Sequence, residues 1–103
     1  MAKAELKFKR NVTVIFNVWT NEMIEAAKEA WGWAGNKVCV VTSGVEGTHS
    51  LTSSHYEGRA IDFRLPKKRS GLHADLSIRL GKNYYIQLTQ KNVHIQVRRG
   101  VTP

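Results

Sequence analysis

Three side chains of this sequence carry the donor atoms of a metal site: His55 and Asp62, seven residues apart, and His94 near the C-terminal end. Two imidazoles and one carboxylate suit zinc, and three protein ligands leave the fourth tetrahedral position for water. Zinc lowers the pKa of that water toward about 7, which supplies hydroxide for attack on a carbonyl carbon. The residue types therefore permit a hydrolytic zinc site, while the alternative stays open that each histidine makes one structural hydrogen bond in the core.

The spacing of His55 and Asp62 restricts how both could bind one ion. A helix would separate them by about 10 Å along its axis. A flat strand would point them to opposite faces of a sheet, because their separation is odd. A single site therefore requires the chain to turn between them, and Gly58 can adopt the dihedral angles that such a turn needs. His94 can approach the same point if its strand is a neighbour of the strand that carries Asp62.

Two helices are expected around these residues. Residues 20–35 combine apolar positions at helical spacing with Thr20 or Asn21 as the N-cap and Gly35 as the stop. Residues 72–81 repeat leucine every four positions before a glycine, which predicts a second helix.

Short apolar or alternating segments predict four strands: 37–43, 59–65, 83–89 and 92–97. The last two form a hairpin, and residues 11–19 are expected to be extended or β-rich. Asp62 and His94 fall on the polar faces of their strands. The order predicts one α+β domain over residues 1–103, with a small, largely antiparallel sheet, two main helices and a basic N-terminal extension over residues 1–11.

Charge and composition narrow the partners. Sixteen Lys and Arg against eight Asp and Glu give a formal charge of +8, which attracts nucleic acid, anionic lipid or an anionic cell-wall polymer. A nucleic-acid partner ranks last, because the sequence shows no aromatic-basic stacking motif. No apolar segment is long enough for a membrane helix, so a soluble protein is expected. Cys39, the only cysteine, is expected to be a buried thiol, and Trp19, Trp31 and Trp33 are expected to pack in the core or against the first helix.

The segment "VTSGVEGTHSLTSSHYEGRAIDFR" resembles the metal-binding segment of the D-Ala-D-Ala carboxypeptidase family of zinc peptidases, whose relatives include bacteriophage endolysins and the signalling domain of hedgehog proteins. The family pattern S-x-H-x-x-G-x-A-x-D is matched at Ser53, His55, Gly58, Ala60 and Asp62. The later "LGKNYYIQLTQKNVHIQV" resembles the closing hairpin that brings the second zinc histidine, so the likeness covers residues 22–97. The resemblance implies a hedgehog/DD-peptidase-like fold in which His55, Asp62 and His94 bind zinc.

The same resemblance implies a function. A zinc-activated water would hydrolyse peptide bonds of peptidoglycan, in a protein that is phage-encoded and acts at the bacterial cell wall or in a virion. The partner would be a peptidoglycan peptide or another anionic cell-wall polymer. Ser53, His49 and Arg59 are the substrate-binding candidates. His49 could polarise a bound carbonyl, and Arg59 could orient the Asp62 carboxylate or hold an acidic substrate group.

Two positions depart from the family pattern. Active members carry a general-base glutamate five positions before the last ligand, where this chain has Thr89, and many carry a histidine two positions before it, where this chain has Asn92. Loss of a general base typically removes about 10²- to 10⁴-fold of rate. Glu46, Glu57 or Asp75 would substitute only within hydrogen-bond reach of the metal water. Enzymatic activity therefore stays open, and the alternative is a catalytically impaired zinc-binding structural or binding module, such as a phage particle component, that keeps the peptidase fold.

Overall fold

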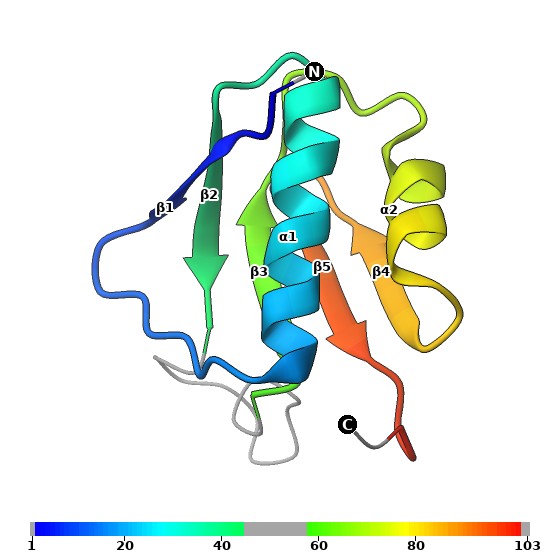
Figure 1. The fold of residues 1–103 in the computed structure, drawn as a ribbon. Helices are drawn as coiled ribbons and strands as arrows, with labels where there is room; N and C mark the ends of the chain where they lie inside the picture. Colours follow the sequence, from blue (N-terminus) through cyan, green and yellow to red (C-terminus); the bar gives the residue numbers. More distant parts are fainter. Residues whose placement is uncertain (1, 45–57, 102–103) are drawn as a thin grey trace.

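A computed structural model of the protein describes residues 2–44 and 58–101 (Figure 1). These residues form two helices and five strands in the order β1 (Glu5–Phe8), α1 (Val18–Trp33), β2 (Val38–Ser43), β3 (Ala60–Arg64), α2 (Leu72–Leu80), β4 (Tyr84–Leu88) and β5 (Asn92–Val97). The strands form one sheet in the order β1-β2-β3-β5-β4. Only the β1–β2 pair in this sheet is parallel. The predicted α+β class and the largely antiparallel sheet are confirmed.

The N-cap of helix α1 lies three residues before Thr20, the first of the two predicted caps. Asn17 is the N-cap: its side chain accepts a hydrogen bond from the Thr20 backbone N–H at 2.9 Å, and the Thr20 hydroxyl accepts one from the Asn17 N–H at 2.8 Å. This reciprocal capping box satisfies two N–H groups that the helix itself leaves without partners. Thr20 therefore acts inside the first turn rather than as the cap. At the other end, Gly35 turns the chain with a φ of 85°.

The core lies between the sheet and the two helices, which cover the same face (Figure 1). Trp31 is its largest buried side chain: its ring lies 5.7 Å from that of Phe63 in β3, and its Nε1 donates to the Arg64 carbonyl at 3.0 Å. The expectation of packing is wrong for Trp33, which is 62% exposed. Residues two positions apart on an α-helix project from nearly opposite sides, so Trp31 and Trp33 cannot both face the core.

The N-terminal region differs from the prediction. Residues 11–19 form no strand before α1 begins, whereas β1 lies inside the segment expected to be a basic extension. Backbone pairing holds β1 against β2: the Glu5 N–H donates to the Lys37 carbonyl at 2.8 Å, and the Lys9 N–H donates to the Val41 carbonyl at 2.8 Å. Main-chain pairing stabilises this edge strand even though its side chains are mostly exposed. Its sequence therefore lacks the apolar alternation by which a strand is predicted.

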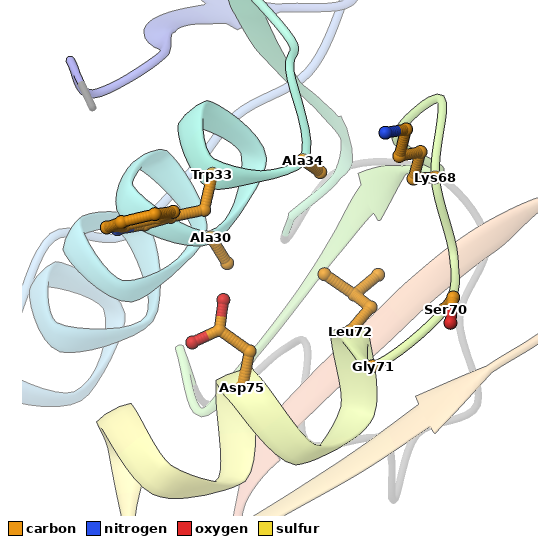
Figure 2. A pocket seen from close by; sticks show the side chains of 8 residues that line it. All are labelled: Ala30, Trp33, Ala34, Lys68, Ser70, Gly71, Leu72 and Asp75. Atoms are coloured by element: carbon orange, nitrogen blue, oxygen red, sulfur yellow. The ribbon is translucent and has the colours of Figure 1, made fainter.

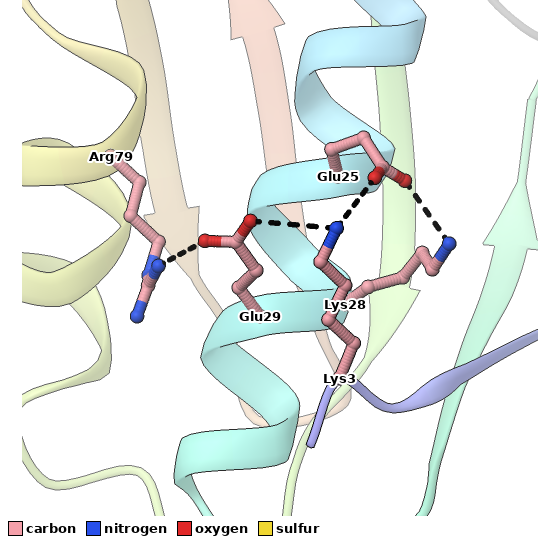
Figure 3. A network of polar contacts seen from close by, with 5 residues as sticks. All are labelled: Lys3, Glu25, Lys28, Glu29 and Arg79. Atoms are coloured by element: carbon pink, nitrogen blue, oxygen red, sulfur yellow. Dashed lines mark hydrogen bonds and ion pairs between the residues drawn. The ribbon is translucent and has the colours of Figure 1, made fainter. Parts of the chain in front are cut away.

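Most described acidic residues lie on the helix side of the molecule, where cations meet them. Figure 3 shows the network: Lys3 and Lys28 each approach Glu25 at 3.1 Å, and Arg79 binds Glu29. Exposed pairs of this kind contribute about 0–1 kcal/mol each to stability. Their main effect is to neutralise charge on the helix side of the molecule. The excess positive charge of the chain is therefore carried by other surfaces.

Within the described residues, neither helix has the length and apolar character needed to cross a bilayer. Helix α1 is the longer, at 16 residues, and one of its faces is polar.

Cys39 is fully buried in β2, as expected, and burial raises the pKa of its thiol to about 12. The thiol is therefore expected to react with a disulfide reagent at pH 8 at least about 100-fold more slowly in the folded protein than in urea, because the reagent attacks the thiolate. The pKa of the thiol in the folded protein lies above the reference value of 9.0, so folding favours the protonated thiol. The stability that this preference contributes is complete below pH 9 and is lost as the pH rises toward 12. Equal rates in both states would contradict the burial.

Candidate metal centre

The predicted metal ligands that the structure describes lie on the face of the sheet opposite the helices. In β3 and β5, alternate side chains such as Ile61 and Ile95 enter the core. The intervening side chains form the surface called here the open face: Asp62, Arg64, Asn92, His94 and Gln96. Strand alternation thus separates the residues that fold the domain from those that could do chemistry.

Asp62 and His94 face each other directly across the β3–β5 pair. The His94 Nδ1 atom lies 2.6 Å from the Asp62 Oδ1 atom, and the His94 Nε2 atom lies 2.7 Å from the Gln96 Oε1 atom. The side chains of His94 and Asp62 are 20% and 17% exposed, respectively. Both side chains are therefore accessible to an ion from solvent, while most of their surface is buried.

The electrostatics of the pair favour a charged histidine. Burial alone would lower the pKa of His94, but the hydrogen bonds that its ring donates to Asp62 and Gln96, together with the charge of Asp62, outweigh burial and raise the pKa. Both ring nitrogens face oxygen atoms, and the imidazolium is the form that donates to both. A metal ion binding here would take the place of the proton, because the imidazole must be neutral at its ligating nitrogen.

Asp62 and His94 supply two of the three predicted zinc ligands. Tetrahedral zinc binds nitrogen and oxygen ligands at about 2.0–2.2 Å, which holds two ligand atoms roughly 3.3 Å apart. The pair at 2.6 Å would therefore have to separate by less than about 1 Å to accept the ion. Within the described residues, 2–44 and 58–101, no group of three or more histidine, cysteine, aspartate or glutamate side chains could hold a metal. The third predicted ligand, His55, lies outside the described residues, so the triad stays a prediction.

Gly58 turns the chain immediately before β3. Its φ is 68°, a left-handed value that favours glycine, and its carbonyl accepts a hydrogen bond from the Asn17 side chain at 2.8 Å. A Cβ atom at this position would lie 3.1 Å from Ile15. The residue that caps α1 thus also fixes the entry to β3, which positions Asp62 four residues later.

The substrate-binding candidates are only partly covered. Ser53 and His49 lie outside the described residues. Arg59 places its guanidinium 4.6 Å from the centre of the Trp19 ring in α1 and donates to the Arg98 carbonyl at 2.9 Å. These contacts give Arg59 a packing role between α1 and the chain after β5, and its role toward a substrate stays a prediction.

Thr89 and Asn92, where the resemblance leads one to expect a glutamate and a histidine, are hydrogen-bonded to each other. The Thr89 hydroxyl lies 2.9 Å from the Asn92 Oδ1 atom and accepts from the Asn92 N–H at 3.0 Å. Both residues close the β4–β5 turn on the open face, beside His94. The local function of these side chains is therefore to hold the turn, and neither supplies a basic group.

Asp75, one of the alternative bases, lies on the wrong side of the sheet. It accepts from Arg79 Nε at 2.8 Å and lines a pocket between the end of α1 and the start of α2, together with Ala30, Trp33 and Leu72 (Figure 2). The sheet separates this pocket from the open face. Asp75 therefore cannot serve a metal site at Asp62 and His94, and Glu46 and Glu57 lie outside the described residues.

One feature of the open face could not be predicted from the sequence. It is a cleft of about 330 Å³ lined by Lys9, Thr42, Ser43, Arg64, Lys91 and Asn92. The lining residues come from four separate segments of the chain. Their positive charges are dispersed along the sequence, so only the folded sheet brings them together.

Comparison with known proteins adds no relative: no protein-family model matches the chain, and no curated protein or solved structure matches it. The functional case therefore depends on the chemistry of the residues described above.

Proposed function

We propose that the protein is a zinc-binding domain of the peptidoglycan-peptidase type, which uses a zinc-activated water to hydrolyse cell-wall peptide bonds. The observation that carries the proposal is the pairing of Asp62 with His94 on the open face, at 2.6 Å. These two side chains belong to the predicted ligand set, come from segments that are distant in sequence, and meet on the face that the described helices leave uncovered.

The residues of this chain would divide the work as follows. Asp62, His94 and His55 would hold the ion, and Gln96 would fix the orientation of the His94 ring through its contact with Nε2, as outer hydrogen-bond partners of metal ligands do. Bound zinc would supply a water of lowered pKa and would polarise the carbonyl of the peptide bond. The basic surface would favour an acidic wall polymer.

A second candidate function is a zinc-binding structural or binding module that has lost turnover, acting at the cell wall or in a virion. The Thr89–Asn92 contact favours it, because both positions where active enzymes carry proton-transfer groups are used here to close a turn. Both candidates require the metal, and they differ in whether the protein cleaves peptides.

Zinc removal tests the shared premise. The protein purified without chelator is expected to contain about one zinc per chain by elemental analysis. Its melting temperature should fall on dialysis against a chelator and recover when zinc is restored, because a ligand at 100 times its Kd stabilises the folded state by about 2.7 kcal/mol. Zinc-free protein whose melting temperature ignores both chelator and added zinc would end both candidates.

Digestion of purified cell walls separates the two candidates. A peptidase is expected to release stem-peptide fragments, detectable by mass spectrometry, and to lose this activity in chelator. A binding module is expected to cosediment with the walls without releasing fragments.

A further inference from the structure

The cleft on the open face assembles cationic and hydrogen-bonding groups from four segments. Lys9 follows β1, Thr42 and Ser43 end β2, and Arg64 ends β3; Lys91 lies in the β4–β5 turn and Asn92 begins β5. Arg64 pairs directly with Asn92 across β3 and β5. Since Asp62 and His94 occupy the next paired position on the same face, the cleft lies beside the candidate metal centre.

The charges of the cleft are one-sided. Its three charged side chains, Lys9, Arg64 and Lys91, are all cationic. In the described parts of the chain none of them has a carboxylate partner, whereas Lys3, Lys28 and Arg79 on the helix side do. Three like charges around one concavity repel one another and produce a positive potential there, which an anion would relieve.

The cleft also offers hydrogen-bonding groups. The Thr42 hydroxyl is buried at its oxygen and has no partner among the described residues. Leaving a buried polar atom without a partner is unfavourable, so such an atom beside a cationic concavity indicates a group that a ligand would satisfy. The Asn92 amide lines the same space.

We infer that this cleft binds a phosphate group, either the free ion or a phosphate ester. Arginine presents a planar set of donors that matches a phosphate, lysine supplies a point charge, and hydroxyl groups donate to the remaining oxygens. Three cations exceed what a single carboxylate would need and suit a group that carries up to two negative charges. The inference goes beyond the proposed zinc function, because it needs no metal.

The test is a titration of chelator-treated, ¹⁵N-labelled protein with inorganic phosphate at constant ionic strength, followed by NMR. Saturable shifts are expected at the backbone amides of Lys9, Thr42, Arg64 and Asn92. Arg64→Gln is expected to weaken binding at least about tenfold, which corresponds to about 1.4 kcal/mol. The matched control, Lys82→Gln, removes the same charge from an exposed position just before β4 and should change the Kd less than twofold.

A second variant and two further ligands test the site and the chemical class of its ligand. The double variant K9Q/K91Q should reproduce the Arg64→Gln loss, so the test survives if either protein fails to fold. Glycerol 3-phosphate binding as well as phosphate supports an esterified ligand, and binding of inorganic phosphate alone supports the free ion. Acetate that binds as tightly as phosphate would overturn the phosphate assignment. Non-saturable shifts, or equal losses in Arg64→Gln and Lys82→Gln, would overturn the site itself. The zinc proposal is unaffected by either result, because the titration contains no zinc.

Discussion

Replacing His94 with alanine is expected to abolish tight zinc binding, with a Kd increase of more than about 100-fold. Mutating a residue that only hydrogen-bonds to a metal ligand typically lowers metal affinity about 10- to 100-fold. A larger loss is expected for His94, which would be a ligand itself. The measurement is competition against a chromophoric chelator, with the chelator-dependent shift in melting temperature as a second readout. Both signals should disappear in His94→Ala.

The matched control is His73→Ala. His73 is an exposed histidine of α2 whose Nε2 atom lies 3.2 Å from the Ile86 carbonyl, on the helix side of the sheet. Its removal should leave zinc affinity unchanged, which excludes adventitious binding to any surface histidine. If His73→Ala and His94→Ala lose zinc equally, or if neither does, the candidate metal centre is wrong.

The metal-free stability of His94→Ala carries separate information. Loss of the imidazole removes the hydrogen bond that the Asp62 carboxylate accepts from His94, which is expected to lower the free energy of unfolding by about 1–3 kcal/mol in urea with chelator present. This cost and the zinc effect add in the holoprotein but can be measured apart.

The strands that carry the site could be predicted from sequence because apolar and polar residues alternate around Asp62 and His94. In β5, Val93, Ile95 and Val97 are buried while His94 between them is not, and β3 shows the same alternation around Asp62. Such a pattern fixes which face a side chain occupies but not which strand lies next to it. The contact between Asp62 and His94 was therefore predictable only on the condition that their strands are neighbours, which the sheet order supplies.

The N-terminal region shows why the remainder of the fold could not be predicted. The apolar residues of 11–19 indicated an extended or β-rich segment, yet no strand forms there: Val12 and Val14 pack against the core from an irregular segment, and Phe16 is 60% exposed. Strand β1 instead forms from residues that are mostly exposed, because main-chain pairing with β2 stabilises it. Interactions of the main chain leave no mark on residue type, so a method that uses side-chain periodicity misses them.

The open-face cleft was missed for a related reason. Lys9, Arg64 and Lys91 are far apart in the chain and unremarkable as single surface cations. Their convergence depends on the order of four strands, and in particular on β5 pairing with β3 rather than lying at the sheet edge. A charge count could indicate an anionic partner but could not locate where it binds.

Thr89→Glu is expected to raise peptide hydrolysis of cell walls by about 10²- to 10⁴-fold over the parent chain, if zinc is bound and only the general base is missing. Thr89 pairs with Asn92 at the end of the hairpin, and Gln87 pairs with His94, so position 89 is the diagonal neighbour of His94 on the open face. Diagonal neighbours lie roughly 7–8 Å apart, within reach of a glutamate side chain. The new carboxylate could accept the proton of the metal water and pass it to the leaving amine.

The matched control is Thr89→Gln, which has nearly the shape of the glutamate variant and the same loss of the Thr89–Asn92 contact but carries no base. Both variants should lose about 1 kcal/mol of stability from the turn, since the Thr89 hydroxyl accepts from the Asn92 N–H at 3.0 Å. Only the glutamate variant should release stem peptides, with a rate that rises as its carboxylate deprotonates. Equal, low activity in both would show that a carboxylate at position 89 is not sufficient for turnover. High activity in the parent chain would show instead that a base is already present, and because Asp75 lies behind the sheet, that base would have to come from another segment.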